Sequence, residues 1–98
     1  MVRFEWDEAK NRANRRKHGV SFELAQRVFD DPNALMLQDR IERGEERWHA
    51  IGEVLGAIVL VVAHTVRPLA SGENIRIISA RKATREERKR YEAQARRY

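Results

Sequence analysis

One apolar stretch, Ala57–Val66, most constrains the fold of this chain because it has strand length and apolar side chains on both faces. Its central part, Ile58–Val62, has no polar position, so we expect this strand in the middle of a sheet. Gly56 predicts a tight hairpin to a preceding strand over Arg47–Leu55. The longest apolar run, Ala57–Ala63, is too short to cross a bilayer, and no membrane span is expected.

The residues before this hairpin predict one short strand and two helices. Arg3–Trp6 alternates polar and apolar side chains, as an edge strand does. A helix is expected over Asp7–Lys17, with its first residue as N-cap and Gly19 as the left-handed stop. Ser21 caps a second helix, which ends at Pro32.

The residues after Pro32 predict strands followed by a last helix. The expected elements are a strand over Ala34–Gln38, a charged turn over Arg40–Glu46, a loop over Pro68–Asn74, a strand from Glu73 or Asn74 to Ala80, and a helix from Thr84, with Glu87 in a capping box, to about Arg97. The order β-α-α-β-β-β-β-α predicts an α+β fold. We expect an antiparallel β-meander with the first two helices on one face and the other face partly open for a ligand or partner.

Composition indicates the charge of the partner and excludes some kinds of catalysis. The 98 residues predict a single domain over 1–98, with a net charge of +5 and a pI near 10.2. This charge favours an anionic partner, most commonly nucleic acid, although an ordinary basic surface is the alternative. The absence of cysteine excludes disulfides and thiol catalysis and fits a cytoplasmic protein. The histidines lie in separate expected elements without metal-ligand spacing, so no metal or other cofactor is expected.

Cations on strands suit cleavage of RNA, in which the 2′-hydroxyl attacks the adjacent phosphate. The protein then needs proton-transfer groups and fixed cations that stabilise charge on the phosphorane. Arg76 interrupts an apolar strand and is a candidate phosphate clamp, or a solvent-facing arginine paired with a glutamate. Arg81 and Lys82 lie at the strand-to-helix corner, and Arg67 ends the central strand. These three are further candidates, or ordinary surface cations.

Two histidines are candidates for proton transfer. His64 follows the apolar run and is either a general base or acid, or a hydrogen-bonded structural histidine at the core edge. His49 shares a strand face with Arg47 and is a candidate second proton-transfer group. Trp48 is expected on the opposite face, in the core. Arg47 is also an RNA-binding candidate. We expect Glu45 to form a surface ion pair with it, and the alternative is that Glu45 is a carboxylate base.

Helical positions supply further RNA-binding candidates. Lys17 and His18 lie at the corner between the first two helices, where they either fix the turn or touch substrate. Arg88 and Tyr91 can share a face of the last helix. They either contact RNA or pack back onto the sheet and pair with a carboxylate.

Four blocks of the sequence carry a family resemblance. They are Phe4-Glu5-Trp6-Asp7 with Lys10 and Asn14, then Lys17-His18-Gly19-Val20-Ser21-Phe22, then Gly44-Glu45 with Arg47 before Ile51-Gly52, and then Ile75–Thr84 with Glu87-Arg88 and Tyr91. In this order they resemble the BrnT toxins, the toxin halves of bacterial BrnT/BrnA toxin–antitoxin pairs. The resemblance implies a RelE-like fold, action on RNA and neutralisation by a BrnA-type antitoxin. Such an antitoxin would bind DNA, so the complex would repress its own operon.

The leading hypothesis is therefore a toxin that cleaves RNA without a metal, by 2′-hydroxyl transesterification, and so inhibits translation and growth. A second hypothesis is a non-catalytic basic module that binds nucleic acid or protein. A third is a toxin of the same fold that poisons a protein such as gyrase.

Overall fold

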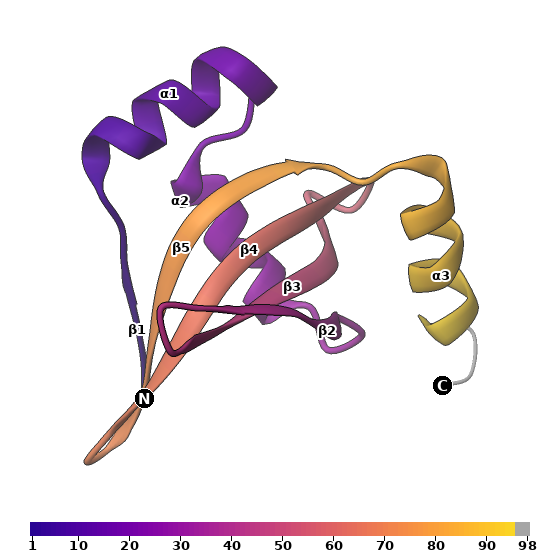
Figure 1. Cartoon of the computed structure of the whole chain (residues 1–98). Coiled ribbons are helices and arrows are strands. Elements are labelled where there is room, and N and C mark those ends of the chain that lie inside the picture. Colours follow the sequence, from indigo (N-terminus) through magenta and orange to yellow (C-terminus); the bar gives the residue numbers. More distant parts are fainter. Residues whose placement is uncertain (96–98) are drawn as a thin grey trace.

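The computed structural model describes residues 1–95 (Figure 1). Its elements, in chain order, are β1 (Val2–Glu5), α1 (Glu8–His18), α2 (Phe22–Ala25), the 3₁₀ helix η1 (Gln26–Asp30), β2 (Leu35–Glu42), β3 (Glu45–Val54), β4 (Ile58–Leu69), β5 (Gly72–Lys82) and α3 (Arg85–Ala95). The predicted α+β class and element order are confirmed. The predicted end of the last helix, near Arg97, lies outside the described residues. None of the helices in the described part has the length and apolar composition that a bilayer crossing requires.

All five strands form one sheet with the order β1-β5-β4-β3-β2. Strands β2 to β5 are an antiparallel meander, as predicted, and β4 is central. The prediction of an antiparallel sheet was wrong for β1, which pairs with β5 in parallel, with Phe4 opposite Ile75. This pairing is available because β1 joins the free side of the last strand and then leads directly into α1.

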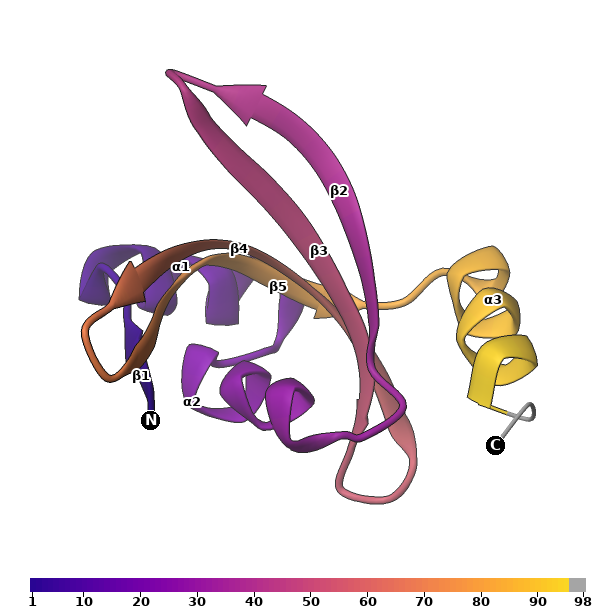
Figure 2. The same cartoon turned by 90° about the horizontal axis from the view of Figure 1, so that it is seen from below.

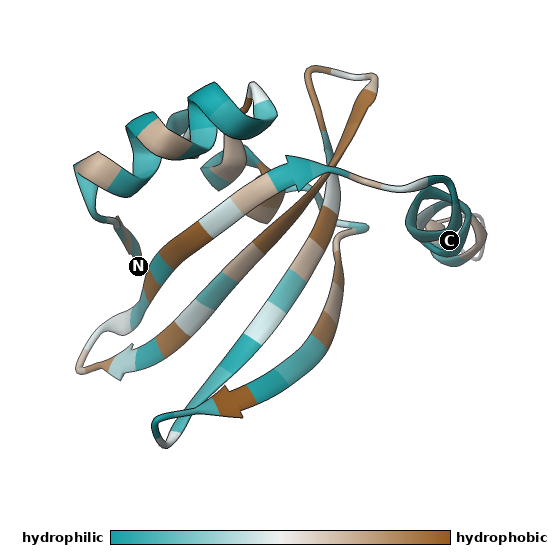
Figure 3. Ribbon diagram, turned by 45° about the horizontal axis from the view of Figure 1, so that its top comes forward, coloured by the Kyte–Doolittle hydropathy of each residue, from teal (hydrophilic) through white to brown (hydrophobic). Residues whose placement is uncertain are grey.

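The strands are longer than their composition indicated. The predicted loop over Pro68–Asn74 is wrong, because β4 continues to Leu69 and β5 begins at Gly72. Likewise, β2 continues through most of the charged stretch, and only Arg43 and Gly44 form the turn. These strand ends read as loops because they contain proline, glycine and charged residues, and they project beyond the body (Figures 1 and 3).

Both N-terminal helices begin at the predicted caps. The Asp7 carboxylate accepts from the Ala9 backbone N–H at 2.8 Å, and Gly19 ends α1 with φ at +71°. Ser21 caps α2, but this second helix changes to 3₁₀ geometry at Gln26, so the single helix predicted there was wrong.

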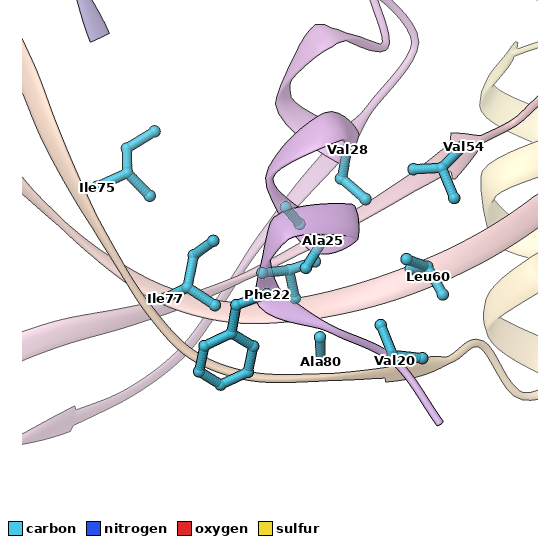
Figure 4. Packing of buried hydrophobic residues seen from close by; sticks show 11 residues of the cluster. Val20, Phe22, Ala25, Val28, Val54, Leu60, Ile75, Ile77 and Ala80 are labelled. Carbon is cyan, nitrogen blue, oxygen red and sulfur yellow. The ribbon is translucent and has the colours of Figure 1, made fainter. Parts of the chain in front are cut away.

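The main core lies between the helices and one face of the sheet, as predicted (Figures 2 and 4). Figure 4 shows Phe22, Ala25 and Val28 packed toward strand side chains that include Leu60 and Ile77. The other face has only a smaller cluster, which joins Ile51, Val59 and Val61 to Tyr91 of α3. The rest of that face is open and is called the open face below.

A buried asparagine holds α1 against β5. The Asn14 side-chain N–H₂ donates to the backbone oxygens of Val20 (2.9 Å) and Ala80 (2.7 Å), and its oxygen accepts from the Ala80 N–H at 3.2 Å. This replaces strand pairing that β1 does not supply, because β1 pairs with β5 only as far as Arg76. Helix α1 therefore runs along the uncovered part of β5.

Candidate functional site

The alternation of side chains along each strand decides which candidates reach the open face. Ile75 and Ile77 belong to the helix-side core, so Arg76 between them points to the open face, where it is exposed. The register of the neighbouring strands extends this set. The predicted site residues on the open face are Arg47, His49, Arg67, Arg76 and Arg81.

A pocket of about 330 Å³ on this face gathers basic side chains from three separate parts of the chain. Its lining consists of Lys10 from α1, Arg43 and Arg47 with Glu42 and Glu45 from the β2–β3 hairpin, and Arg76 and Ile78 from β5. We call it the basic pocket. Among residues 1–95, neither Lys10 nor Arg76 forms an ion pair, whereas Arg47 lies 3.2 Å from the Glu42 carboxylate. Among the same residues Arg43 forms no ion pair either, so the pocket holds three cations available for an anion and a fourth that shares a carboxylate.

Local structure explains why these side chains meet. Arg43 (φ +55°) and Gly44 (φ +78°) form a two-residue turn with positive φ at both positions, which suits the twist of a hairpin. This turn places Glu42, Glu45 and Arg47 together at the hairpin end. Lys10 arrives from the other side, because Asn14 fixes α1 along β5.

His49 lies beside the pocket and has an orienting carboxylate. It is two residues from Arg47 on β3, so their side chains are about 7 Å apart on one face. Its Nε2 lies 3.6 Å from an oxygen of Asp39, and both side chains are 31% exposed. This histidine is therefore accessible and partly oriented, as a proton-transfer group needs to be.

His64 lies on the other side of the sheet. It is 2% exposed, its ring stands perpendicular to Phe29 at 4.8 Å, and its Nδ1 lies 3.1 Å from the Val62 carbonyl oxygen. Burial lowers the pKa of His64 and so favours its neutral ring. Trp48 pairs with it across the strands and is half-buried on the same core side, as predicted. The placement fits the structural interpretation of His64 rather than the catalytic one.

Arg81 lies on the open face, but its guanidinium is already paired with the carboxylate of Glu87. Arg81 and Lys82 lie just before the last helix, as expected, but the predicted strand end at Ala80 was wrong, because both residues belong to β5. The Arg81 guanidinium donates to both Glu87 carboxylate oxygens, at 2.7 and 2.9 Å. This pairing raises the pKa of Arg81 and lowers that of Glu87 to about 2.

The remaining open-face ion pairs differ from the expected one. The sequence suggested an ion pair between Glu45 and Arg47, but the two do not pair. A carboxylate oxygen of Glu45 lies instead 3.8 Å from the Nη2 of the exposed Arg67. Arg47 pairs with Glu42 instead, because the turn aligns Glu42 with Glu45 across the hairpin.

The helical RNA-binding candidates do not join the basic pocket. Tyr91 is 5% exposed and donates to Asp31 at 2.5 Å, so it packs back onto the sheet and pairs with a carboxylate. Arg88 donates to the Ala57 carbonyl oxygen and, with Lys82, lines a small pocket of about 200 Å³. Lys17 and His18 lie at the opposite end of α1 from Lys10.

A larger cavity of about 630 Å³ lies at the far end of the molecule, between η1, the end of β3, and α3. Its charged walls are mainly acidic: Asp30, Asp31, Glu53 and Glu92 face a single arginine, Arg27. An RNA phosphate is therefore expected in the smaller basic pocket and not in this cavity. Among residues 1–95, no three histidine or acidic side chains gather as a metal site.

Sequence reasoning missed three members of the site. Lys10 was visible only as part of a family-matching block, and Arg43 only as a charge in a turn. Asp39 gave no signal, because its proximity to His49 depends on the register of β2 against β3, which shifts between Gln38 and Ile41.

The fold and this site together define a class: a small basic α+β domain whose open sheet face carries cations for an anionic ligand. The chain belongs to the family described as ribonuclease toxin, BrnT, of type II toxin–antitoxin systems, whose sequence profile matches residues 6–87. It is thus a ribonuclease toxin with RNA as substrate and an antitoxin as partner.

A solved structure supports this assignment. The chain is similar to the Brucella abortus ribonuclease toxin BrnT, with 28% sequence identity and a TM-score of 0.65 over 87% of this chain and 100% of that one. No curated protein sequence matches the chain. The resemblance and the fold inferred from the sequence are confirmed, and the ribonuclease hypothesis prevails over the non-catalytic and gyrase-directed alternatives.

Proposed function

We propose that this toxin cleaves RNA without a metal, by transesterification in the basic pocket. The 2′-hydroxyl loses its proton to a base, and its oxygen forms a bond to the adjacent phosphorus. The bond from phosphorus to the 5′-oxygen then breaks, and that oxygen takes up a proton. The products are a 2′,3′-cyclic phosphate and a 5′-hydroxyl. The observation that carries the proposal is the convergence of Lys10, Arg47 and Arg76 on one pocket.

Arg76 is the principal phosphate clamp. It is exposed and has no ion-pair partner among residues 1–95, so no internal contact has to break before phosphate binds. Its planar guanidinium can bind two phosphate oxygens at once. Arg47 completes the clamp by exchanging Glu42 for phosphate, and Lys10 adds a third charge from α1. Fixed cations of this kind stabilise the charge that develops on the phosphorane.

His49 is the proton-transfer group of this mechanism, as the base for the 2′-hydroxyl or as the acid for the 5′-oxygen. It lies next to the clamp on the same strand face, and Asp39 orients its ring. An imidazole can both accept and donate a proton, and a positioned general base or acid contributes roughly 10²–10⁴-fold to the rate. Arg81 stays with Glu87, and Arg67 stays at the rim of the site.

The biological consequence is inhibition of translation in the cytoplasm. A BrnA-type antitoxin would neutralise the toxin, and because that antitoxin binds DNA, the complex would repress its own operon. The family assignment and the net charge of +5 support this part of the proposal.

Cleavage of an RNA oligonucleotide in excess EDTA tests the chemistry. We expect fragments that end in a 2′,3′-cyclic phosphate, and no cleavage where a single 2′-deoxy nucleotide precedes the scissile bond. Arg76→Ala and His49→Ala should each lower the rate by about 10²-fold or more. Lys89→Ala, which removes an exposed cation of α3, is the matched control and should cleave normally.

Two results would contradict the mechanism. Loss of cleavage in EDTA that added Mg²⁺ restores would show a metal requirement. Full activity of Arg76→Ala would move the site away from the basic pocket. Thermal unfolding of each variant separates lost chemistry from lost structure.

A further inference from the structure

A second group of arginines lies on α1, outside the basic pocket. Arg12, Arg15 and Arg16 are exposed and by themselves line a surface hollow of about 360 Å³. Two residues turn an α-helix by about 200°, so Arg12 projects from nearly the opposite side of α1 to Lys10. The hollow and the basic pocket therefore lie on opposite sides of the same helix.

The arginines of this hollow are not neutralised by the fold. Among residues 1–95, none of them forms an ion pair. The one acid within α1, Glu8, accepts from Trp6 and Asn11 instead. Glu23 accepts from Asn11 as well, and Arg15 acts on it only as a nearby charge.

The spacing of the arginines works against the helix. Arg12 lies three residues before Arg15 and four before Arg16, and like charges at these spacings repel each other. The last-turn positions of Arg15 and Arg16 suit the helix dipole, but Arg12 lies outside that turn. Figure 3 shows α1 as mostly hydrophilic, and Arg12, Arg15 and Arg16 are all exposed. A charge pattern that costs stability without an internal partner is expected where an external anion binds.

We propose that Arg12, Arg15 and Arg16 form an exosite that binds the sugar-phosphate backbone of the RNA substrate away from the cleaved bond. The proposal rests on RNA as the substrate and not on the chemistry assigned to the basic pocket. An RNA strand that fills the basic pocket has to pass around α1, about 10–12 Å across, to reach the exosite. The exosite therefore acts on longer RNA and leaves the shortest substrates unaffected.

The substitutions Arg12→Gln, Arg15→Gln and Arg16→Gln, combined in one protein, test the exosite. The matched control combines Arg85→Gln, Lys89→Gln and Arg90→Gln, which remove the same charge from exposed positions of α3. We expect the exosite variant to raise KM for a long RNA about 10-fold or more at unchanged kcat. Cleavage of a dinucleotide should be unchanged. The control should behave as the unmodified protein with both substrates.

Binding separates this proposal from the cleavage mechanism. With a long 2′-O-methyl RNA, which cannot be cleaved through its 2′-oxygen, the slope of log affinity against log salt should fall by about 2 in the exosite variant. This result can hold even if the proposed chemistry fails. An equal fall of the salt slope in the control variant would overturn the exosite. So would a loss of dinucleotide cleavage in the exosite variant as large as its loss with long RNA. Unchanged RNA binding with lost antitoxin binding would overturn RNA as the occupant in favour of an acidic protein.

Discussion

At the residue scale, the side of the sheet on which a histidine lies decides its role. His49 and His64 lie on adjacent strands and were both candidates for proton transfer. Strand periodicity shows which positions share a face, but not which face is covered. His64 follows Leu60 and Val62 in regular alternation toward the helix-side core, whereas His49 shares the other face with Ile51. The sequence therefore could not separate the two, because the separation depends on long-range pairing.

Burial of His64 predicts a stability that depends on pH. Because burial lowers its pKa, His64 binds a proton on unfolding when the pH lies below its unfolded value of about 6.5. The unfolded state then holds more protons, so stability falls as the pH decreases below about 6.5, by at most about 1.4 kcal/mol per pH unit from this residue. We expect His64→Leu to remove this dependence, as measured by urea unfolding between pH 7 and pH 5.

His18→Gln is the matched control, because His18 lies at the helix corner and is only half-buried. It should retain the pH dependence of the unmodified protein. If the free energy of unfolding of His64→Leu depends on pH as strongly as that of the unmodified protein, another group causes this dependence. Loss of dinucleotide cleavage in a stably folded His64→Leu protein would return His64 to the catalytic candidates.

At the element scale, α3 is attached to the sheet by a few specific contacts. The Glu87 carboxylate accepts from Nη1 and Nη2 of Arg81 and also from the Thr84 backbone N–H at 2.8 Å. Thr84 returns the contact by accepting from the Glu87 N–H at 3.2 Å, so the predicted capping box is confirmed. Glu87 thus both starts the helix and fixes it to β5.

Substitution Glu87→Gln should loosen this attachment. We expect a loss of about 1–2 kcal/mol in the free energy of unfolding at pH 7, less than the full pKa shift implies because solvent reaches the pair. The pKa of Glu87 is lowered to about 2 in the fold, so its contribution is complete above an unfolded value of about 4.5. It is lost as the pH falls toward 2. The difference between the variant and the unmodified protein, measured by urea unfolding, should therefore shrink between pH 5 and pH 3.

Glu86→Gln provides the control, since Glu86 is exposed on the same turn and forms no ion pair among residues 1–95. It should leave stability nearly unchanged. A difference for Glu87→Gln that stays constant down to pH 3 would mean that the charge of Glu87 does not stabilise α3.

The β3–β4 turn contains a leucine, Leu55, in a left-handed backbone conformation that branched side chains disfavour. Leu55 has φ at +55° and is 63% exposed, whereas Gly56 after it has φ at +73°. A branched side chain is costly in this region, and asparagine adopts it more readily. We expect Leu55→Asn to raise the free energy of unfolding by about 0.5–1 kcal/mol, with no gain for Leu55→Ala. A lower urea midpoint for Leu55→Asn would show instead that the Leu55 side chain contributes packing.

The sequence predicted the elements better than their ends. Caps and periodicity located the strands and the α-helices, because these signals act within a few residues, but they did not show the change to 3₁₀ geometry at Gln26. The extensions of β4 past Pro68 and of β2 past Gln38 gave no such signal, since polar strand ends held only by partner strands resemble loops. The basic pocket depends on these extensions, because the hairpin end that carries Arg47 lies beyond the part of β2 that was predicted.

At the scale of the whole molecule, the two faces of the sheet have different roles: one stabilises the fold and the other carries the candidate site. One face is covered by helices and carries the main core, and the other gathers cations in the basic pocket, where Lys10, Arg43 and Arg76 form no ion pair among residues 1–95. Such charges repel each other at low salt, and the free protein bears that repulsion until an anion binds. Unfavourable contacts of this kind are common at functional sites.

The substitution Arg76→Gln should therefore lower the cleavage rate by about 10²-fold or more and yet stabilise the free protein. We expect the free energy of unfolding to rise by a few tenths of a kcal/mol at about 0.01 M salt, where the Debye length is about 30 Å. The gain should disappear near 1 M salt, where that length is about 3 Å. Urea unfolding at the two salt concentrations measures both values. Lys89→Gln removes a cation that lies outside the pocket and should change stability less at low salt. If Arg76→Gln destabilises the protein at both concentrations, Arg76 supports the fold and its charge is not held ready for phosphate.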